Sequence, residues 1–159
     1  NPSVLKKSNG STAEIDSYFS HILPEERDEL IDLNEELDAD ILMAFKNDQL
    51  DHTYVDRVAN QYMRYGSVLN THLLFAQIGA RIQHLSKAIQ EHEKIFLNKI
   101  SVIRELLESF NFTLISFRKN IFEQESSNPT FYNASLLSDI QMIQDVLEQT
   151  EVVGDIEFF

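Results

Sequence analysis

The chain of 159 residues is long enough for one domain and too short for two comfortable cores. Its 26 acidic residues outnumber the 13 basic ones, and the resulting formal net charge of -13 argues against nucleic-acid binding, which needs a basic footprint. Only four glycines are present, too few for the turns of a β-sandwich or the phosphate loops of an α/β nucleotide-binding fold, so we predict an all-α protein.

The amino-terminal residues predict a flexible leader followed by a short helix. Residues 1–11 are polar, which favours a loose segment. Ser11 or Thr12 can then cap a short helix that ends near Leu23. We expect residues 12–153 to form a single helical-bundle domain.

Pro24 marks the start of an amphipathic helix that we expect over residues 25–46. Proline followed by two glutamates suits the first turn of a helix, where the backbone amides are unpaired and the dipole favours negative charge. Apolar residues then recur at spacings of three and four: Leu30, Leu33, Leu37, Ile41, Leu42 and Phe45. Carboxylates occupy much of the remaining circumference: Asp32, Glu35, Glu36, Asp38 and Asp40. This pattern predicts an acidic outer face.

The next helix is expected over residues 52–90, with Asp51 or Thr53 as its cap. Its first apolar stripe consists of Val55, Val58, Ala59 and Tyr62. Gly66 lies inside this helix, where glycine costs roughly 0.5 to 1 kcal/mol relative to alanine. We therefore expect Gly66 to mark a close approach between helices or a local break.

Residues 78–121 carry apolar side chains at spacings of four and three, with one histidine as the exception. The pattern is typical of one very long helix or of two helices in the same phase, broken near residues 90–93. A compact domain favours the break, and we expect a separate helix over residues 93–124. Two residues in the middle of the pattern, Leu107 and Phe110, are expected in the core.

The last helix is expected over residues 134–151, after a loop rich in serine, asparagine and proline. Its apolar stripe consists of Leu136, Leu137, Ile140, Ile143, Val146 and Leu147. Gly154 is its expected C-cap, and residues 154–159 form an acidic and aromatic tail. The predicted fold is thus an all-α, up-and-down bundle of four main helices with a short helix before them.

Residues that commonly carry catalysis are not arranged for it. The chain has no cysteine, its five histidines form no HExxH pair, and no glutamate is followed three residues later by histidine. A GxSxG nucleophile elbow is also missing. We therefore predict no metal, no cofactor and no enzymatic activity.

The sequence also bears on where the chain acts. It contains no apolar run of about 18 residues, so we expect no membrane insertion. The first ten residues have neither a hydrophobic segment nor a starting methionine, which predicts a soluble fragment or a processed form. The missing cysteine leaves cytosol and periplasm open, and we predict a cytoplasmic location.

Three stretches of the chain form a pattern: the acidic residues 30–45, KNDQ at 46–49 and YMRYGS at 62–67. This pattern resembles the histidine-phosphotransfer domain of bacterial two-component signalling. Residues 30–45 resemble its acidic first helix, and residues 46–49 (KNDQ) resemble the loop that follows. Residues 62–67 (YMRYGS) are similar to its His-x-x-Lys-Gly-Ser motif. The resemblance implies a helical bundle that docks a receiver-type partner.

The motif departs from the family at its reactive positions. Tyr62 stands where the family has the phospho-accepting histidine, Tyr65 stands where it has lysine, and Arg64 replaces an apolar residue. In this register the chain has no acceptor imidazole, so the resemblance implies a degenerate relative that binds partners. A second register places His84 three residues before Lys87, with a small residue next, and would make His84 the phospho-acceptor.

Three functions follow as hypotheses. The leading one is a non-catalytic signalling module that docks a receiver-type domain or a second copy of itself. Its expected contact residues are Asp32, Glu35, Glu36, Arg57, Tyr62, Arg64 and Tyr65. The second is an active phosphotransfer protein that uses His84 with Lys87. The third is a ligand-sensing bundle, with a pocket lined by the phenylalanines at positions 75, 96, 110, 112, 117, 122 and 131.

Overall fold

The computed structural model describes residues 22–44, 50–124 and 128–157, with side chains as far as residue 148. The predicted leader and nearly all of the predicted short first helix lie outside these residues, as do the last two residues of the predicted tail.

The described residues are mostly helical and contain no strand, which confirms the all-α prediction. The α-helices within these ranges are α2 (Pro24–Met43), α3 (His52–Asn70), α4 (Ala76–Glu91), α5 (Glu93–Asn98), α6 (Ile100–Phe117) and α7 (Asn133–Glu157). A 3-10 turn, η1 (Leu73–Phe75), leads into α4, and a π-helical turn, η2 (Arg118–Glu123), extends α6.

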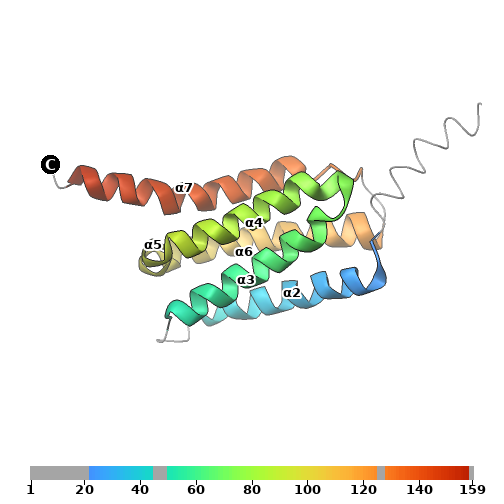
Figure 1. The fold of residues 1–159 in the computed structure, drawn as a ribbon, viewed down its shortest axis with the longest axis horizontal. Coiled ribbons are helices and arrows are strands. Elements are labelled where there is room, and N and C mark those ends of the chain that lie inside the picture. Colours follow the sequence, from blue (N-terminus) through green and yellow to red (C-terminus); the bar gives the residue numbers. More distant parts are fainter. Residues whose placement is uncertain (1–21, 45–49, 125–127, 158–159) are drawn as a thin grey trace, which may run out of the picture.

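The five long helices run up and down, with α5 at the turn between α4 and α6 (Figure 1). Their contacts form a closed ring: α2 packs on α3 and α6, α4 packs on α3 and α7, and α6 packs on α7. The apolar side of each helix faces the middle of this ring. Leu107 and Phe110 are fully buried there, as predicted.

The predicted helix over residues 52–90 is wrong, because the structure divides it into α3 and α4. His72 is extended, with φ -110° and ψ 128°, and the Thr71 hydroxyl donates to the Val68 carbonyl oxygen at 2.8 Å. The chain reverses here without proline or glycine, and the apolar η1 hides the turn in the sequence pattern. The number of main helices is therefore five in the described residues.

The two helices on either side of this turn approach each other at Gly66 and Gly79. A Cβ atom added to Gly66 would lie 2.6 Å from the Gly79 carbonyl oxygen, and one added to Gly79 would lie 2.6 Å from the Gly66 carbonyl oxygen. Ala59 precedes Gly66 by seven residues, and Ser86 follows Gly79 by seven. The Ser86 hydroxyl donates to the Ala59 carbonyl oxygen at 2.5 Å. The expected close approach at Gly66 is confirmed, and its partner is Gly79.

The other boundaries follow the prediction in part. Asp51 caps α3, since its carboxylate accepts a hydrogen bond from the Tyr54 amide at 3.2 Å. The break predicted near residues 90–93 falls at His92, where φ is -111° and ψ is 39°. Beyond it, the helix predicted over 93–124 is divided into α5, α6 and η2.

Two expectations about apolar and terminal positions are wrong. Helix α7 continues to Glu157, so Gly154 does not end it. Glycine costs a helix too little to stop one by itself. Leu42 is 54% exposed rather than part of the buried stripe, because the buried residues of α2, from Leu30 to Ile41, already fill its side of the ring.

Candidate functional site

A groove runs between α2 and α3. It has a volume of about 680 Å³ and is open to solvent. Its lining residues are Glu36, Ala39, Asp40, Thr53, Asp56, Arg57, Asn60, Gln61 and Arg64. The groove thus unites Glu36, Arg57 and Arg64, three of the residues expected to contact a partner.

Asp40 organises the middle of the groove. Its carboxylate accepts hydrogen bonds from Arg57 Nε at 3.1 Å and from Gln61 Nε2 at 2.9 Å. The Tyr54 hydroxyl donates to the Asp40 carbonyl oxygen at 3.0 Å. Burial raises the pKa of Tyr54 to about 12, and the nearby Asp40 charge adds to this. Tyr54 is therefore a neutral donor at pH 7, and these bonds fix α3 against the end of α2.

Both arginines of the groove already have carboxylate partners on α2. Arg57 pairs with Asp40, and Arg64 lies 3.1 Å from Glu29. Glu36 and Asp56 add further negative charge to the lining, so its carboxylates outnumber its guanidinium groups. The arrangement favours a cationic group over an anionic one.

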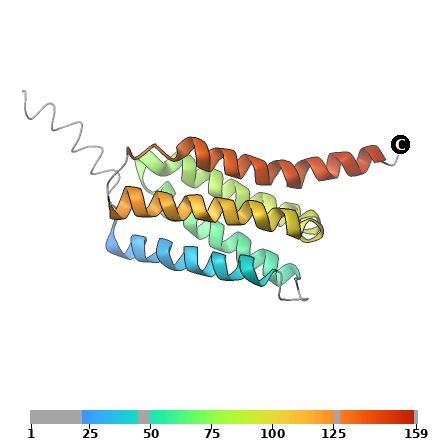
Figure 2. The ribbon, with the colours of Figure 1, turned by 180° about the vertical axis from the view of Figure 1, so that it is seen from behind.

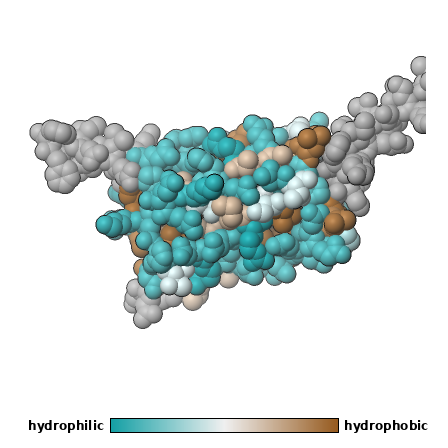
Figure 3. Space-filling model, in the orientation of Figure 1, coloured by the Kyte–Doolittle hydropathy of each residue, from teal (hydrophilic) through white to brown (hydrophobic). Residues whose placement is uncertain are grey.

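The acidic face of α2 continues the groove onto open surface. Asp32, Glu35 and Glu36 are all exposed, as the sequence predicted. Figure 3 shows that the surface over α2, α3 and α4 is mostly hydrophilic on this side of the molecule. These carboxylates lie within about one and a half turns of one helix, where they add to one another's electrostatic field.

Tyr62 and Tyr65 do not belong to this surface, and their prediction as partner contacts is wrong. Both are fully buried. The Tyr62 hydroxyl donates to Asn111 Oδ1 at 3.4 Å, and its ring lies 5.7 Å from that of Phe110. Burial raises the pKa of each phenol well above its usual value. The apolar stripe that contains Tyr62 was the better signal, because it placed this residue on the inner side of α3.

A buried polar cluster between α2 and η2 has no counterpart in the predictions. Arg118 Nε donates to Asn34 Oδ1 at 2.9 Å, and Arg118 Nη1 donates to Glu123 at 2.9 Å. The Asn34 side chain also lies beside the Tyr65 phenol. The sequence signals this cluster only through Asn34, a polar residue one turn after Leu30 in the apolar stripe of α2. The cluster ties α2 to the π-helical turn η2.

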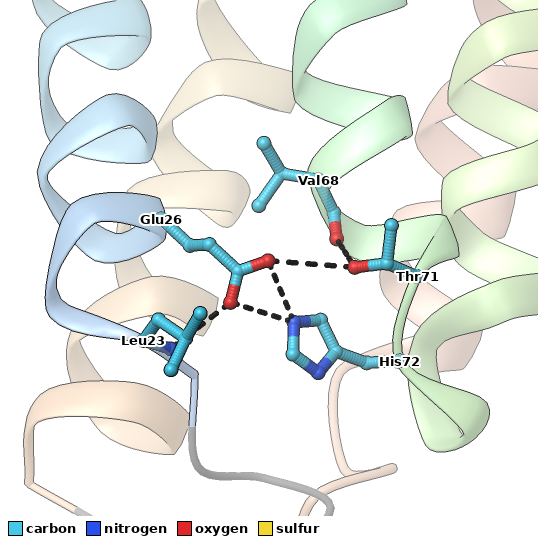
Figure 4. A network of polar contacts seen from close by, with 5 residues as sticks. All are labelled: Leu23, Glu26, Val68, Thr71 and His72. Carbon is cyan, nitrogen blue, oxygen red and sulfur yellow. Dashed lines mark hydrogen bonds and ion pairs between the residues drawn. The ribbon is translucent and has the colours of Figure 1, made fainter.

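Glu26 fixes the other end of α2. Its carboxylate accepts a hydrogen bond from the Leu23 amide at 3.0 Å, which caps the helix. Figure 4 shows the same carboxylate facing Thr71 and His72, which follow the end of α3. His72 Nε2 lies 3.1 and 3.2 Å from its two oxygens. Helices α2 and α3 are therefore joined by polar contacts near both ends of α2.

The residues of the two alternative hypotheses are placed as follows. His84 and Lys87 are both exposed on α4, about one turn apart. The phenylalanines do not line one pocket: Phe112 and Phe131 are 74% and 68% exposed, and the other five are buried. The rings of Phe75, Phe117 and Phe122 pack edge to face at 5.0 to 5.6 Å, as in an ordinary core.

Among the described residues, no group of three histidine, cysteine, aspartate or glutamate side chains is placed to hold a metal ion. In the same part of the chain, no helix has the length and apolar character needed to cross a membrane.

Comparison of the chain with protein-family models, with curated proteins and with solved structures gave no match.

Proposed function

We propose that this chain is a non-catalytic helical interaction module that docks a basic protein surface through α2 and the α2–α3 groove. The observation that carries the proposal is the groove, a solvent-open cleft of about 680 Å³ in which both arginines are paired with carboxylates of α2. Once these pairs are formed, the lining keeps a net negative charge, carried by Glu36 and Asp56.

The exposed face of α2 supports the same function. Glu36 lines the groove, and Asp32 and Glu35 are exposed close to it in sequence on the same helix. Charges of this kind act mainly on the rate of association, because they guide a partner of opposite sign into place. A receiver-type domain remains the partner that the resemblance to phosphotransfer domains implies. A second copy is disfavoured at this surface, because each copy carries a net charge of -13.

Photo-crosslinking tests where the partner binds. A photoreactive amino acid at Asn60, which is exposed and lines the groove, is expected to capture a protein that contacts it through a basic surface. The same group at Gln77, exposed on α4, is the matched control. Equal yields from both positions, or capture of a second copy of this chain alone, would contradict the proposal.

Charge removal tests how the partner binds. The variant Asp32→Asn, Glu35→Gln, Glu36→Gln is expected to associate with the captured protein several-fold more slowly at low salt, because it has lost the charges that attract a basic surface. Added salt should slow the original chain in the same way, since it screens this attraction. The dissociation rate should change less. An association rate that responds neither to this triple replacement nor to salt would leave the acidic face without a role in docking.

A second candidate function, phosphotransfer through His84, is favoured by one observation. His84 and Lys87 are both exposed in the middle of α4, where a phosphodonor can reach the imidazole. The Tyr62 position of the other register has no such access. Incubation with phosphoramidate should then give acid-labile phosphate on His84 and none on His84→Gln. Equal labelling of the two proteins would exclude this candidate.

A further inference from the structure

The opposite flank of α2 has a different character from the α2–α3 groove. Here α2 lies against α6 (Figure 2), and a cleft of about 300 Å³ opens between the two helices. Its lining residues are Asp38, Ile41, Leu42, Glu108, Phe112 and Ile115. Four of the six are large and apolar, so the cleft has an apolar floor beside the acidic face of α2.

Two of the apolar residues are strongly exposed. Phe112 is 74% exposed and Leu42 is 54% exposed, whereas Ile41 below them is buried. The core does not need them, because Phe110 and Leu114 already fill the inner side of α6 in this region. Exposed apolar side chains that gather at a cleft are typical of a binding surface.

The polar residues of the cleft are both acidic, and neighbouring side chains hold them in place. Asp38 accepts a hydrogen bond from Asn111 Nδ2 at 2.8 Å, and Glu108 accepts one from Arg104 at 2.8 Å. Glu35 precedes Asp38 by three residues on the same side of α2, which places a further exposed carboxylate beside the cleft. An apolar floor with an acidic rim matches a segment that is apolar in the middle and basic at its edges.

We propose that this cleft seats a large apolar side chain from a basic amphipathic helix of a protein partner. Charge complementarity selects this occupant. A second copy would bring another acidic α2 against the rim, and an anionic lipid surface would be repelled by it. The inference rests on the proposed function for the charge of the partner, and it adds the apolar contact that holds the partner in place.

Binding of a model helix tests the inference. The probe is a peptide of about 18 residues with leucine on one face and lysine on the other. It is expected to bind the full chain, to shift the NMR signals of Leu42, Phe112 and Ile115, and to bind Phe112→Ala at least tenfold more weakly. Phe131→Ala removes a phenyl group of similar exposure, 68%, outside the cleft and should bind the peptide like the original chain.

Companion peptides separate the two requirements. A version with alanine in place of leucine, or with glutamate in place of lysine, should bind at least tenfold more weakly. Equal affinity of the leucine–lysine peptide for Phe112→Ala and Phe131→Ala would overturn the inference, as would Phe112-dependent dimers or vesicle binding in the absence of peptide binding. If Phe112→Ala did not weaken peptide binding while the α2 triple variant still slowed association, the cleft would not be the binding site. The proposed function would then still stand.

Discussion

The α3–α4 pair and the attachment of α2 illustrate two ways of joining helices in one bundle. Helices α3 and α4 meet backbone to backbone at Gly66 and Gly79, where a single added methyl group would lie 2.6 Å from a carbonyl oxygen. Helix α2 also buries an apolar stripe, but long polar side chains of α3 reach across to it, as in the Asp40–Arg57 and Glu29–Arg64 pairs. Clefts open on both of its flanks.

This difference separates the scaffold of the bundle from its candidate binding surfaces. A seam of small residues admits no side chain and leaves no space for a ligand, because interiors are packed as densely as organic crystals. Long side chains hold helices farther apart and leave grooves that a partner can enter. We therefore expect substitutions in the α3–α4 seam to change stability, and substitutions around α2 to change binding.

An ordinary core contact sets the scale for this comparison. Leu107 is fully buried on α6, and Leu107→Ala is expected to lower the free energy of unfolding by about 2 to 5 kcal/mol through lost burial and a cavity. Val102 lies on the same helix and is 48% exposed, so Val102→Ala is the control and should change the free energy of unfolding by less than about 0.5 kcal/mol. Denaturant unfolding measures both, and a loss below about 0.5 kcal/mol for Leu107→Ala would place this residue at the surface.

The seam itself is tested by adding one methyl group. Gly79→Ala brings Cβ to 2.6 Å from both the Asn70 nitrogen and the Gly66 carbonyl oxygen, so the backbones must separate. We expect Gly79→Ala, and likewise Gly66→Ala, to lower the free energy of unfolding by about 1 to 3 kcal/mol and to lower the melting temperature. Gln77→Ala on the exposed side of α4 is the control. A higher melting temperature would contradict the close packing. It would show instead the gain of roughly 0.5 to 1 kcal/mol expected when alanine replaces glycine in an unhindered helix.

The polar attachment of α2 should be far less sensitive. Arg64 and Glu29 form an ion pair whose side chains are 56% and 37% exposed, and solvent screens such pairs. Arg64→Gln is therefore expected to lower the free energy of unfolding by less than about 1 kcal/mol. If this replacement destabilised the protein more than Gly79→Ala, the contrast between the two regions would be reversed.

The smallest expected effect lies at the start of α3, where His52 links it to α5. His52 donates to the Glu93 carboxylate and lies 3.1 Å from Asp56, and the hydrogen bond to Glu93 is the main reason that its pKa is raised above 6.5. A raised pKa in the folded state stabilises the protein fully below pH 6.5, and this contribution disappears as pH rises through the folded pKa.

NMR titration measures this effect directly. His52 should titrate above 6.5, and Glu93→Gln should lower its pKa. The difference in unfolding free energy between the original chain and His52→Gln should shrink as pH rises. Titration of His52 at or below 6.5 would contradict the link between α3 and α5.

Local patterns of the sequence determined the class of fold and the starts of several helices. Scarce glycine and apolar spacings of three and four indicated helices, Pro24 marked the start of α2, and Asp51 marked that of α3. The exposed carboxylates of α2 were also predictable, since a helix with one buried stripe must turn its charged residues outward. These features depend on residues within a few turns of one another, and periodicity reports them directly.

Only the tertiary structure decided where the chain reverses and which side chains meet. The turn after α3 has apolar residues that continue the helical pattern, so its position depends on the contact of Gly66 with Gly79, 13 positions away. Tyr62 and Tyr65 were misplaced because a motif of residue types carries no information about burial. The partners Asn34 and Arg118 lie 84 positions apart, and the two clefts beside α2 are shaped by α3 and α6. Long-range packing sets these features, because each requires two helices to come together in one particular register.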